Sequence, residues 1–478
     1  MVAGADVRGR EVHSRIRLAV LAAAVAAAFA PAAHAAVRPV TWCGDATSST
    51  DRPDVVGGDQ IHVVYAVPGD STDRFTQVAS AIATDVGAIG DWWRRQDPTR
   101  APRFDLAGFV CSGAGSLDIS DVRLPHPSTY YNQASLPRIQ LLRDDLLAAG
   151  FDDPAKKYLV YYDQAQTTAA SDCGAAYVNA QSGGAHGYAA VYVAPNLESV
   201  TPGRGCGSIE PDGVRGGYLA VVAAHELVNE LGALDPATPG PPHRCAGDPL
   251  HPCDNSLDVL APTPTAATLA AAILDYGHDD YYAHSGSWWD VQDSAWLRHL
   301  DAPEYRVRVT VGAGGRSVVD SSQPSVACAQ PSTCHWTWQA GSELTLSAEA
   351  APGFRFVGWR GCPSAQGDVC TLTVDRARAV GAQFAPPLRV TGFHLAFSND
   401  RSRLTATTHL SAAAHADLVG CSFARQPIVM SVLRGRVATC TWSVPTRFRG
   451  HRLTGVVELD AKGETLVSKR FHVRVPRR

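Results

Sequence analysis

The stretch YLAVVAAHELVNELGALDP (218–236) decides how the largest part of this chain is interpreted. Its apolar residues recur at helical spacing, and a glycine at position 232 supplies a stop signal, so the sequence predicts a helix that ends near Gly232. A step of four residues places His225 and Asn229 on one face, while Leu227 lies on the other. The helix therefore has one face for a core and one face that carries polar groups.

The polar face matches part of a metal-binding pattern. In H-E-x-x-H, two histidines on one helical face hold zinc and the glutamate is the general base. His225 and Glu226 fit this pattern, but Asn229 stands at the second histidine position. The longer pattern H-E-x-x-H-x-x-G-x-x-H adds a glycine turn and a third ligand. Gly232 matches the glycine, and Asp235 stands at the third-ligand position.

Several further stretches carry a wider resemblance: KYLVYYD, AAVYVAP, HPCDNSLDVLAP and LDYGHDDYYAHSGS. Together with the helix they resemble a group of exported actinobacterial zincin-like domains of the metzincin type, over most of residues 37–302. The resemblance implies a zinc peptidase with Glu226 as its catalytic base. It also implies that His243, in the sequence GPPH, corresponds to the loop histidine of that group.

The chain departs from this group at two positions. Leu260 stands where the group has the methionine of its turn, and Leu for Met conserves volume at a cost typically below ~1.5 kcal/mol. Asn229 is more serious, because an amide oxygen is not among the usual ligands of zinc. The expected metal ligands are therefore His225, Asn229, and Asp235 or His243, in an impaired site. Residues in the loop HPCDNSLDVL are alternative replacement ligands: His251, Asp254 and Asp258.

Three functions follow from this pattern. The first is a secreted zinc-metallopeptidase-like protein with an impaired HExxN site that is weakly active or inactive. The second is a functioning zinc endopeptidase that uses Asn229 or a loop residue as a ligand. The third is a purely extracellular binding or adhesion protein. The expected partner is accordingly a polypeptide substrate or an extracellular ligand. The loop GHDDYYAHSG (277–286) is a further candidate for a hard cation, or an ordinary solvated loop.

The N-terminus predicts export. Four arginines precede the apolar run LAVLAAAVAAAFA, and an A-x-A site follows at residues 33–35, so residues 1–35 are expected to be a signal peptide. No later stretch is long and apolar enough to cross a membrane. In a secreted protein the 12 cysteines predict disulfides. We expect sequential pairs: Cys43–Cys111, Cys173–Cys206, Cys245–Cys253, Cys328–Cys334, Cys362–Cys370 and Cys421–Cys440.

The pattern of predicted strands and helices changes twice along the chain, which predicts three domains after the signal peptide. Residues 36–302 alternate strands and helices, as expected of an α+β or α/β zincin-like domain. Residues 303–386 are β-rich, and GFRFVGWRGC followed by VGAQF resembles a divergent, internalin-type bacterial B-repeat. Residues 387–478 consist of short alternating strands, which favours a small Ig-like sandwich.

Charge is distributed unevenly. The whole chain carries a net charge of −4, whereas residues 388–478 contain 15 Lys and Arg against 5 Asp and Glu. Such a basic module suggests contact with an anionic cell-envelope surface, although an inert basic surface is the alternative. No nucleic acid is expected as a partner, because no recognisable nucleic-acid-binding motif is present.

Overall fold

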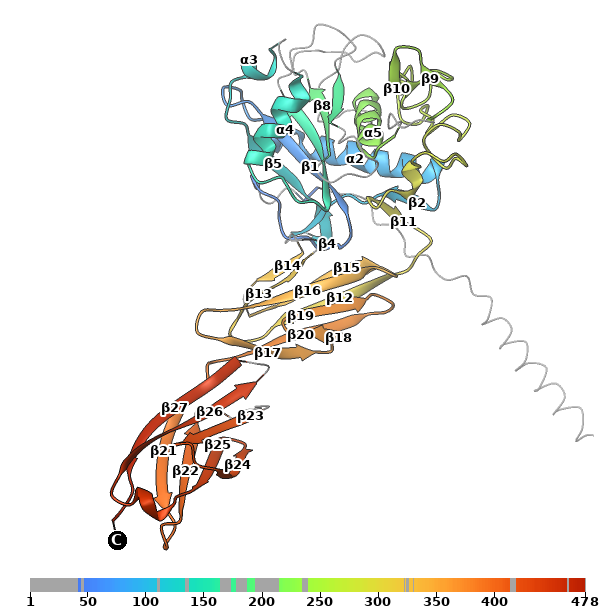
Figure 1. Cartoon of the computed structure of the whole chain (residues 1–478). Coiled ribbons are helices and arrows are strands. Elements are labelled where there is room, and N and C mark those ends of the chain that lie inside the picture. The colour runs from blue at the N-terminus through green and yellow to red at the C-terminus, as the bar shows by residue number, and fades with distance from the viewer. Residues whose placement is uncertain are drawn as a thin grey trace, which may run out of the picture.

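The computed structural model describes residues 42–43, 47–109, 112–133, 137–163, 173–177, 187–193, 215–233, 240–321, 323, 326–329, 331–412, 418–461 and 464–477. The expected signal peptide and Asp235 lie outside these residues. Figure 1 shows three successive parts, a mixed α/β part followed by two β parts. The predicted succession of a mixed region and two β regions is thus confirmed. The boundaries proposed for the three domains stay a prediction.

The first part is built on a five-stranded sheet of order β5-β1-β6-β8-β7. β5, β1, β6 and β8 run parallel, and β7 pairs antiparallel with β8 at the edge. These strands are β1 (Gln60–Val67), β5 (Ile119–Arg123), β6 (Lys156–Asp163), β7 (Gly174–Tyr177) and β8 (Tyr188–Val193). Shorter strands are β2 (Arg100–Pro102), β3 (Leu106–Phe109), β4 (Ser112–Leu117), β9 (Arg244–Cys245), β10 (Asp248–Pro252) and β11 (Leu297–His299).

Helices cover both faces of this sheet (Figure 1). Alternate residues of β1 divide between two cores, as the two-residue period of a strand requires. Val63 and Tyr65 pack with α2 (Phe75–Gln96) and α5 (Tyr218–Glu230), whereas Val64 packs with α4 (Arg138–Ala148). A short α3 (Ser128–Tyr131) and the 3-10 helix η2 (Val291–Asp293) complete the part.

The second part is a pair of sheets around one core. One sheet has the order β15-β12-β20-β17 and the other β14-β13-β16-β19-β18. All pairs are antiparallel except β12 with β20. Phe356 and Trp359 pack against this core, as expected from the sequence. The strands are β12 (Glu304–Val311), β13 (Gly315–Asp320), β14 (Ala327–Ala329), β15 (Thr333–Gln339), β16 (Glu343–Ala350), β17 (Arg355–Arg360), β18 (Ser364–Gln366), β19 (Val369–Thr373) and β20 (Arg378–Ala385).

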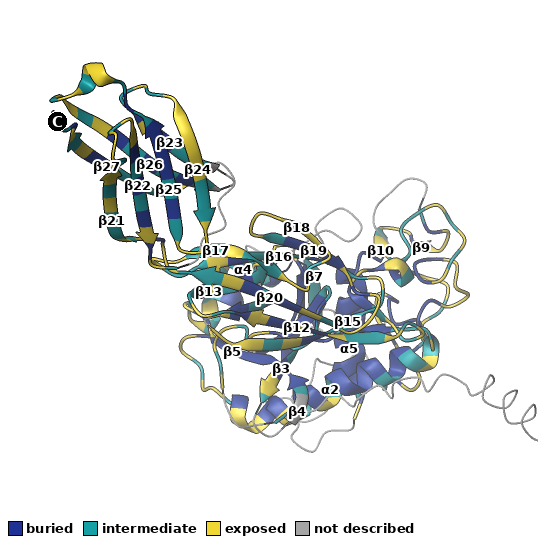
Figure 2. Ribbon diagram, turned by 90° about the horizontal axis from the view of Figure 1, so that it is seen from below, coloured by how far each residue is buried: buried dark blue, intermediate teal, exposed yellow. Residues whose placement is uncertain are grey.

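The third part also has two antiparallel sheets, of orders β21-β22-β25-β24 and β23-β26-β27. Trp442 is buried between them against Phe423 and Phe471. The name Ig-like stays an interpretation of this arrangement. Its elements are β21 (Val390–Phe397), β22 (Arg403–Leu410), β23 (Leu418–Phe423), β24 (Ile428–Arg434), β25 (Val437–Ser443), η3 (Thr446–Phe448), β26 (Arg452–Ala461) and β27 (Glu464–Arg474). Figure 2 shows the buried stripes along these strands.

Disulfides stabilise all three parts. Four predicted pairs are confirmed: Cys245–Cys253, Cys328–Cys334, Cys362–Cys370 and Cys421–Cys440. Cys43 and Cys173 are also disulfide-bonded, and the partners expected for them lie outside the described residues. Among the described residues, no helix has the length and apolar character that crossing a bilayer requires.

A buried network of charged side chains links β1, β5 and β6 of the first part to the segments beside them. The Lys156 ammonium donates to three carboxylates, Asp51, Asp54 and Asp105, at 2.6, 2.7 and 2.7 Å. His62 donates from Nδ1 to Asp105 at 2.7 Å, and its Nε2 lies 2.9 Å from the Ser120 hydroxyl. Ligand atoms of Asp51, His62, Asp105 and Asp118 lie close enough together to hold a metal ion. Cationic side chains already pair with these carboxylates, Lys156 with Asp51 and Asp105 and Arg52 with Asp118.

This network predicts a pH-dependent stability. Burial alone would lower the pKa of His62, but the charge of Asp51 and the hydrogen bond to Asp105 outweigh it and raise the pKa to about 9. A raised histidine pKa gives stability that is complete below the unfolded value of about 6.5 and is lost as the pH rises through 9. The opening free energy of β1 amides, measured by hydrogen exchange, should therefore fall across this window. His62→Gln should remove that part of the fall, and an unchanged slope would contradict the assignment.

Candidate metal centre

The helix α5 carries the polar face that the sequence predicted. Every residue of α5 is buried, and the leucines and valines of its core side are fully enclosed. His225, Glu226 and Asn229 keep 8, 7 and 8 % of their surface exposed. The helix ends where expected, because Gly232 adopts a φ of 95°, which favours glycine. The three polar side chains are therefore almost as enclosed as the apolar side chains of the helix, of which Leu219 and Val222 keep 7 and 6 % of their surface exposed.

The orientation of His225 is fixed by one hydrogen bond. Its Nδ1 lies 2.7 Å from the carbonyl oxygen of Val259. A carbonyl can only accept, so Nδ1 carries the proton and Nε2 presents its lone pair. Burial, followed by the nearby His251, lowers the pKa of His225 to about 4, so the ring is neutral at ordinary pH. This is the arrangement that a metal-ligating histidine uses, with its second nitrogen bonded to a carbonyl.

His251 faces His225 from β10. The two Nε2 atoms are 3.2 Å apart. On the other side of the His251 ring, the Asp248 carboxylate lies 2.8 Å from Nδ1, although it is not aligned for a hydrogen bond. The β9–β10 hairpin that carries both residues is closed by the Cys245–Cys253 disulfide. The hairpin therefore delivers a second imidazole to the polar face of α5.

The separation of the two nitrogens allows two chemical states. Two imidazole nitrogens bound to one tetrahedral zinc at 2.0–2.1 Å lie about 3.3 Å apart, which agrees with the observed 3.2 Å. In the other state Nε2 of His251 carries a proton and donates it to Nε2 of His225. The first state fits the donor set of zinc, and the second is a purely structural hydrogen bond. A zinc-binding measurement distinguishes them.

Glu226 points toward the edge strand β7. A β-carbon at Gly174 would lie 2.6 Å from both Cγ and Oε1 of Glu226 and 2.8 Å from the carbonyl oxygen of Ala190. Only glycine fits there, so the carboxylate rests directly on β7. Burial raises the pKa of Glu226 to about 8. Within the described residues no hydrogen bond of this side chain is seen.

The other predicted ligands are in different situations. Asn229 lies one helical turn after His225 on the same face. Asp235 lies outside the described residues. His243 faces Asp280 and Asp279, at 3.2 and 3.6 Å from its Nδ1, and within the described part of the chain it makes no contact with His225. The ligand roles of these residues stay predictions.

His243 belongs to a second group of ionisable side chains. Candidate ligand atoms of His243, Asp254, Asp279 and Asp280 all lie within 4.8 Å of one another. Slight burial would lower the pKa of His243, but Asp280 and Asp279 raise it, so the histidine favours its cationic form. Asp279 and Asp280 belong to the loop 277–286 that the sequence marked as a cation candidate, whereas His243 and Asp254 come from elsewhere in the chain.

The turn DVLAP lies beneath His225. Asp258 is fully buried and accepts from the backbone of Leu260 at 2.7 Å and of Tyr276 at 2.8 Å, and from the Tyr281 hydroxyl at 2.8 Å. Leu260, the residue at the methionine position, is fully buried in the main core. The turn therefore keeps its packing role and presents the Val259 carbonyl to the site.

Sequence reasoning missed two features of this site. The sequence alone offers His251 only as one of three replacement ligands, although its place two residues before a cysteine of a closely spaced pair is a signal that a hairpin carries it. Gly174 belongs to no recognisable motif, because its close approach to Glu226 depends on the packing of α5 against β7. Both contacts join residues that are far apart in the sequence, so no short sequence pattern predicts them.

Comparisons with known proteins give no family. No family model matches the sequence, and no curated protein matches it. Among solved structures, wild-type OgpA from Akkermansia muciniphila is similar with a TM-score of 0.27 and 11 % identity, over 89 % of this chain and 96 % of that chain. Catalytically inactive OgpA in complex with an O-glycopeptide substrate gives 0.25 and 11 %, over 92 and 98 %. A DUF3823 family protein from Bacteroides ovatus gives 0.15 and 11 %, over 36 and 100 %. Scores this low carry no argument about function.

The contact between Glu226 and Gly174 generates a prediction. Gly174→Ala should displace the carboxylate and the edge strand, and overpacking of this kind typically costs about 1–3 kcal/mol of unfolding free energy. Gly358→Ala is the matched control, because this strand glycine has open space around its α-carbon. Thermal unfolding of the two variants measures the difference. Equal melting temperatures would mean that the close contact at Gly174 does not exist.

Proposed function

We propose that this chain is a zinc-dependent peptidase-like protein whose metal is held by His225 and His251. The observation that carries the proposal is the separation of 3.2 Å between the two Nε2 atoms, together with the hydrogen bond that fixes the tautomer of His225. A catalytic zinc site takes three protein ligands. The third is Asn229 or the predicted Asp235, and with Asn229 the site holds zinc weakly.

The residues around the pair have separable tasks. When bound, zinc supplies Lewis acidity toward a carbonyl and lowers the pKa of water. Once its carboxyl group is ionised, Glu226 accepts a proton from the attacking water and passes it to the leaving amine. The Val259 carbonyl holds the His225 ring, and the Asp248 carboxylate lies 2.8 Å from Nδ1 of His251, on the side of the ring away from the metal.

The edge strand β7 is suited to binding an extended polypeptide. It pairs with β8 on one side, and within the described residues no strand pairs with its other side. A peptide that adds to such an edge forms main-chain hydrogen bonds. Because Glu226 rests on Gly174 of the same strand, a peptide bound there would have its backbone beside the candidate metal centre.

Zinc binding tests the ligand assignment. Elemental analysis of the purified protein should find zinc, and His251→Ala should lower the zinc affinity by at least about 10-fold, since even outer-shell changes cost that much. His243→Ala is the matched control, because it removes the other loop histidine and should leave the affinity unchanged. The reverse result would reassign the ligand to His243. A protein that binds no zinc would contradict the proposal and favour a purely binding function.

Repair of the motif tests the weakness of the site. Asn229→His should raise the zinc affinity by at least about 10-fold and increase cleavage of a peptide library followed by mass spectrometry. Adding Glu226→Gln should abolish the cleavage while zinc stays bound, because it removes the base and spares the ligands. Equal zinc affinity for the parent and Asn229→His would show that Asn229 does not limit the site.

A further inference from the structure

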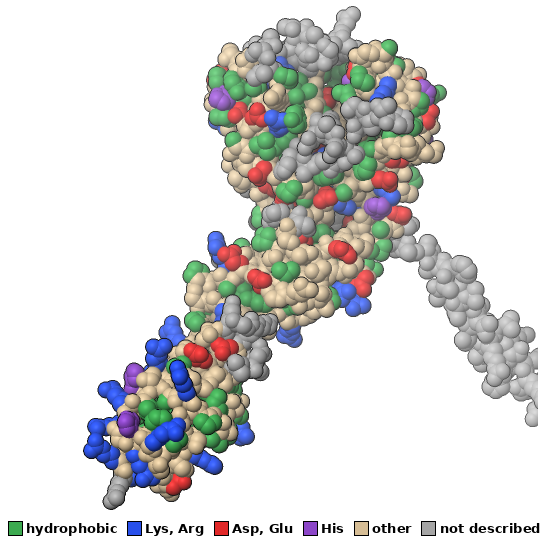
Figure 3. Space-filling model, viewed as in Figure 1, with side chains coloured by type: hydrophobic (Ala, Val, Ile, Leu, Met, Phe, Trp, Pro, Cys, Tyr) green, Lys and Arg blue, Asp and Glu red, His purple; other side chains and the backbone are tan. Residues whose placement is uncertain are grey.

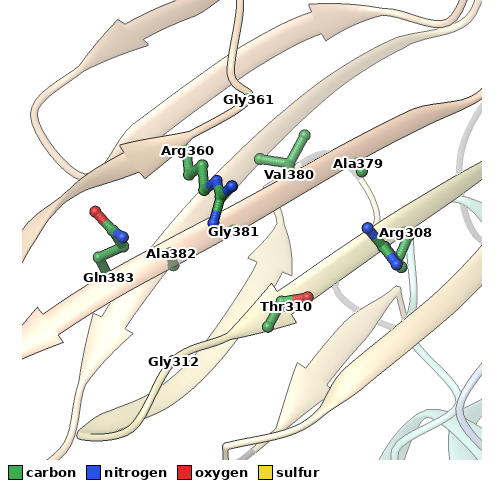
Figure 4. Close-up of a pocket in the computed structure, with 10 residues that line it drawn as sticks. All are labelled: Arg308, Thr310, Gly312, Arg360, Gly361, Ala379, Val380, Gly381, Ala382 and Gln383. Carbon is green, nitrogen blue, oxygen red and sulfur yellow. The ribbon is translucent and has the colours of Figure 1, made fainter.

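The outer face of the second part carries a trough that no part of the proposed function uses. It has a volume of about 490 Å³ and lies on the sheet β15-β12-β20-β17 (Figure 4). Its floor is the central strand β20, where Ala379 and Gly381 offer little or no side chain. In the sheet register Arg308 of β12 is the neighbour of Ala379, and Arg360 of β17 is the neighbour of Gly381. The two arginines thus stand on opposite sides of the floor.

Both arginines are exposed and lack a protein counter-ion. Within the described residues neither Arg308 nor Arg360 takes part in a hydrogen bond or ion pair. In contrast, Arg316 of the same part is paired with Glu349 at 2.7 Å. The ten lining residues, all described, include no acidic side chain. His335 is the register neighbour of Arg308 and adds no negative charge. The trough is therefore a site of uncompensated positive charge.

We propose that this trough binds an acidic glycan through its carboxylate groups. Each guanidinium offers a planar fork that matches a carboxylate with two hydrogen bonds. Thr310 and Gln383 also line the trough and can exchange hydrogen bonds with sugar hydroxyls. The bare floor between the arginines lets a chain lie close to the sheet.

Other linear ligands fit this trough less well. β20 is already paired with β12 and β17, so a peptide cannot bind by adding a strand there. Single-stranded nucleic acid requires aromatic side chains on which bases stack. None of the lining residues is aromatic, and the nearby Trp359 and Phe356 pack against the core. Carboxylates combined with hydroxyl groups are therefore the chemistry that the lining favours.

The test uses oligogalacturonate, a chain of carboxylated sugars, as the probe. Its affinity for the purified protein is measured by calorimetry in the presence of a chelator, so the result is independent of zinc. Arg308→Ala combined with Arg360→Ala should weaken binding by at least about 10-fold, as expected for the loss of charge-assisted hydrogen bonds. Arg434→Ala combined with Arg436→Ala removes the same charge from the basic third part and should change the affinity less than about 2-fold.

A second variant separates shape from charge. In Gly381→Val the new β-carbon would meet its neighbours at 3.8 Å or more, so the sheet accepts it while the side chain fills the floor. Binding should weaken although the net charge is unchanged. Unchanged affinity in Gly381→Val, or an equal loss in the Arg434 and Arg436 control, would overturn the trough as the site. Inorganic polyphosphate that binds as tightly, with the same losses, would overturn the assignment to a glycan.

Discussion

The hydrogen bond from His225 to the Val259 carbonyl ties the ligand-bearing helix α5 to the turn that packs beneath it. That turn opens the loop of residues 258–281, whereas the second imidazole of the candidate centre, His251, comes from β10. The bond sets the tautomer of His225, so it determines which nitrogen can receive a metal. The loop in turn is ordered around the buried carboxylate of Asp258, which accepts from two backbone amides and the Tyr281 hydroxyl. The orientation of His225 thus depends in part on a buried carboxylate that is bonded to the backbone and to a tyrosine.

The first part contains two buried groups of polar side chains, which differ in how their hydrogen-bond donors and acceptors are matched. Around Lys156 every strong donor is matched, since three carboxylates receive the ammonium and His62 adds a further cation. These charged hydrogen bonds stabilise one conformation, although Asp51 Oδ1 and Asp105 Oδ1 accept none of them. Around His225 the matching is incomplete, because a lone pair faces a second imidazole and Glu226 is buried without a partner among the described residues. Incomplete matching is costly for folding, and it is typical of functional sites.

Local patterns predicted the elements of the fold, and long-range contacts determined the sites. The helical period of α2 and α5, the apolar runs of β1 and β6, and the close cysteine pairs were sufficient to place those features. His251 lies 26 residues after His225 and contacts it from a disulfide-closed hairpin. The periodic spacing of apolar residues in a helix or strand cannot predict such a contact. The trough could not be predicted from the sequence, because it depends on how β12 and β17 pair with β20, and these strands are separated along the chain. Charge was predicted as a bulk property, and Figure 3 shows the Lys and Arg side chains gathered on the third part.

The first part also protects an edge of the second. β15 is the outer strand of its sheet, and its Thr337 exchanges backbone hydrogen bonds with Val55 and Gly57 at 3.1 and 2.9 Å. A β-carbon at Gly57 would lie 2.0 Å from the Trp338 ring, so the indole and this segment are in close contact. An unpaired edge strand is a template for association with other chains. If the second part were released by proteolysis, this edge and the Trp338 ring would lose their cover, and the fragment would be prone to aggregate although its own core and disulfides were intact.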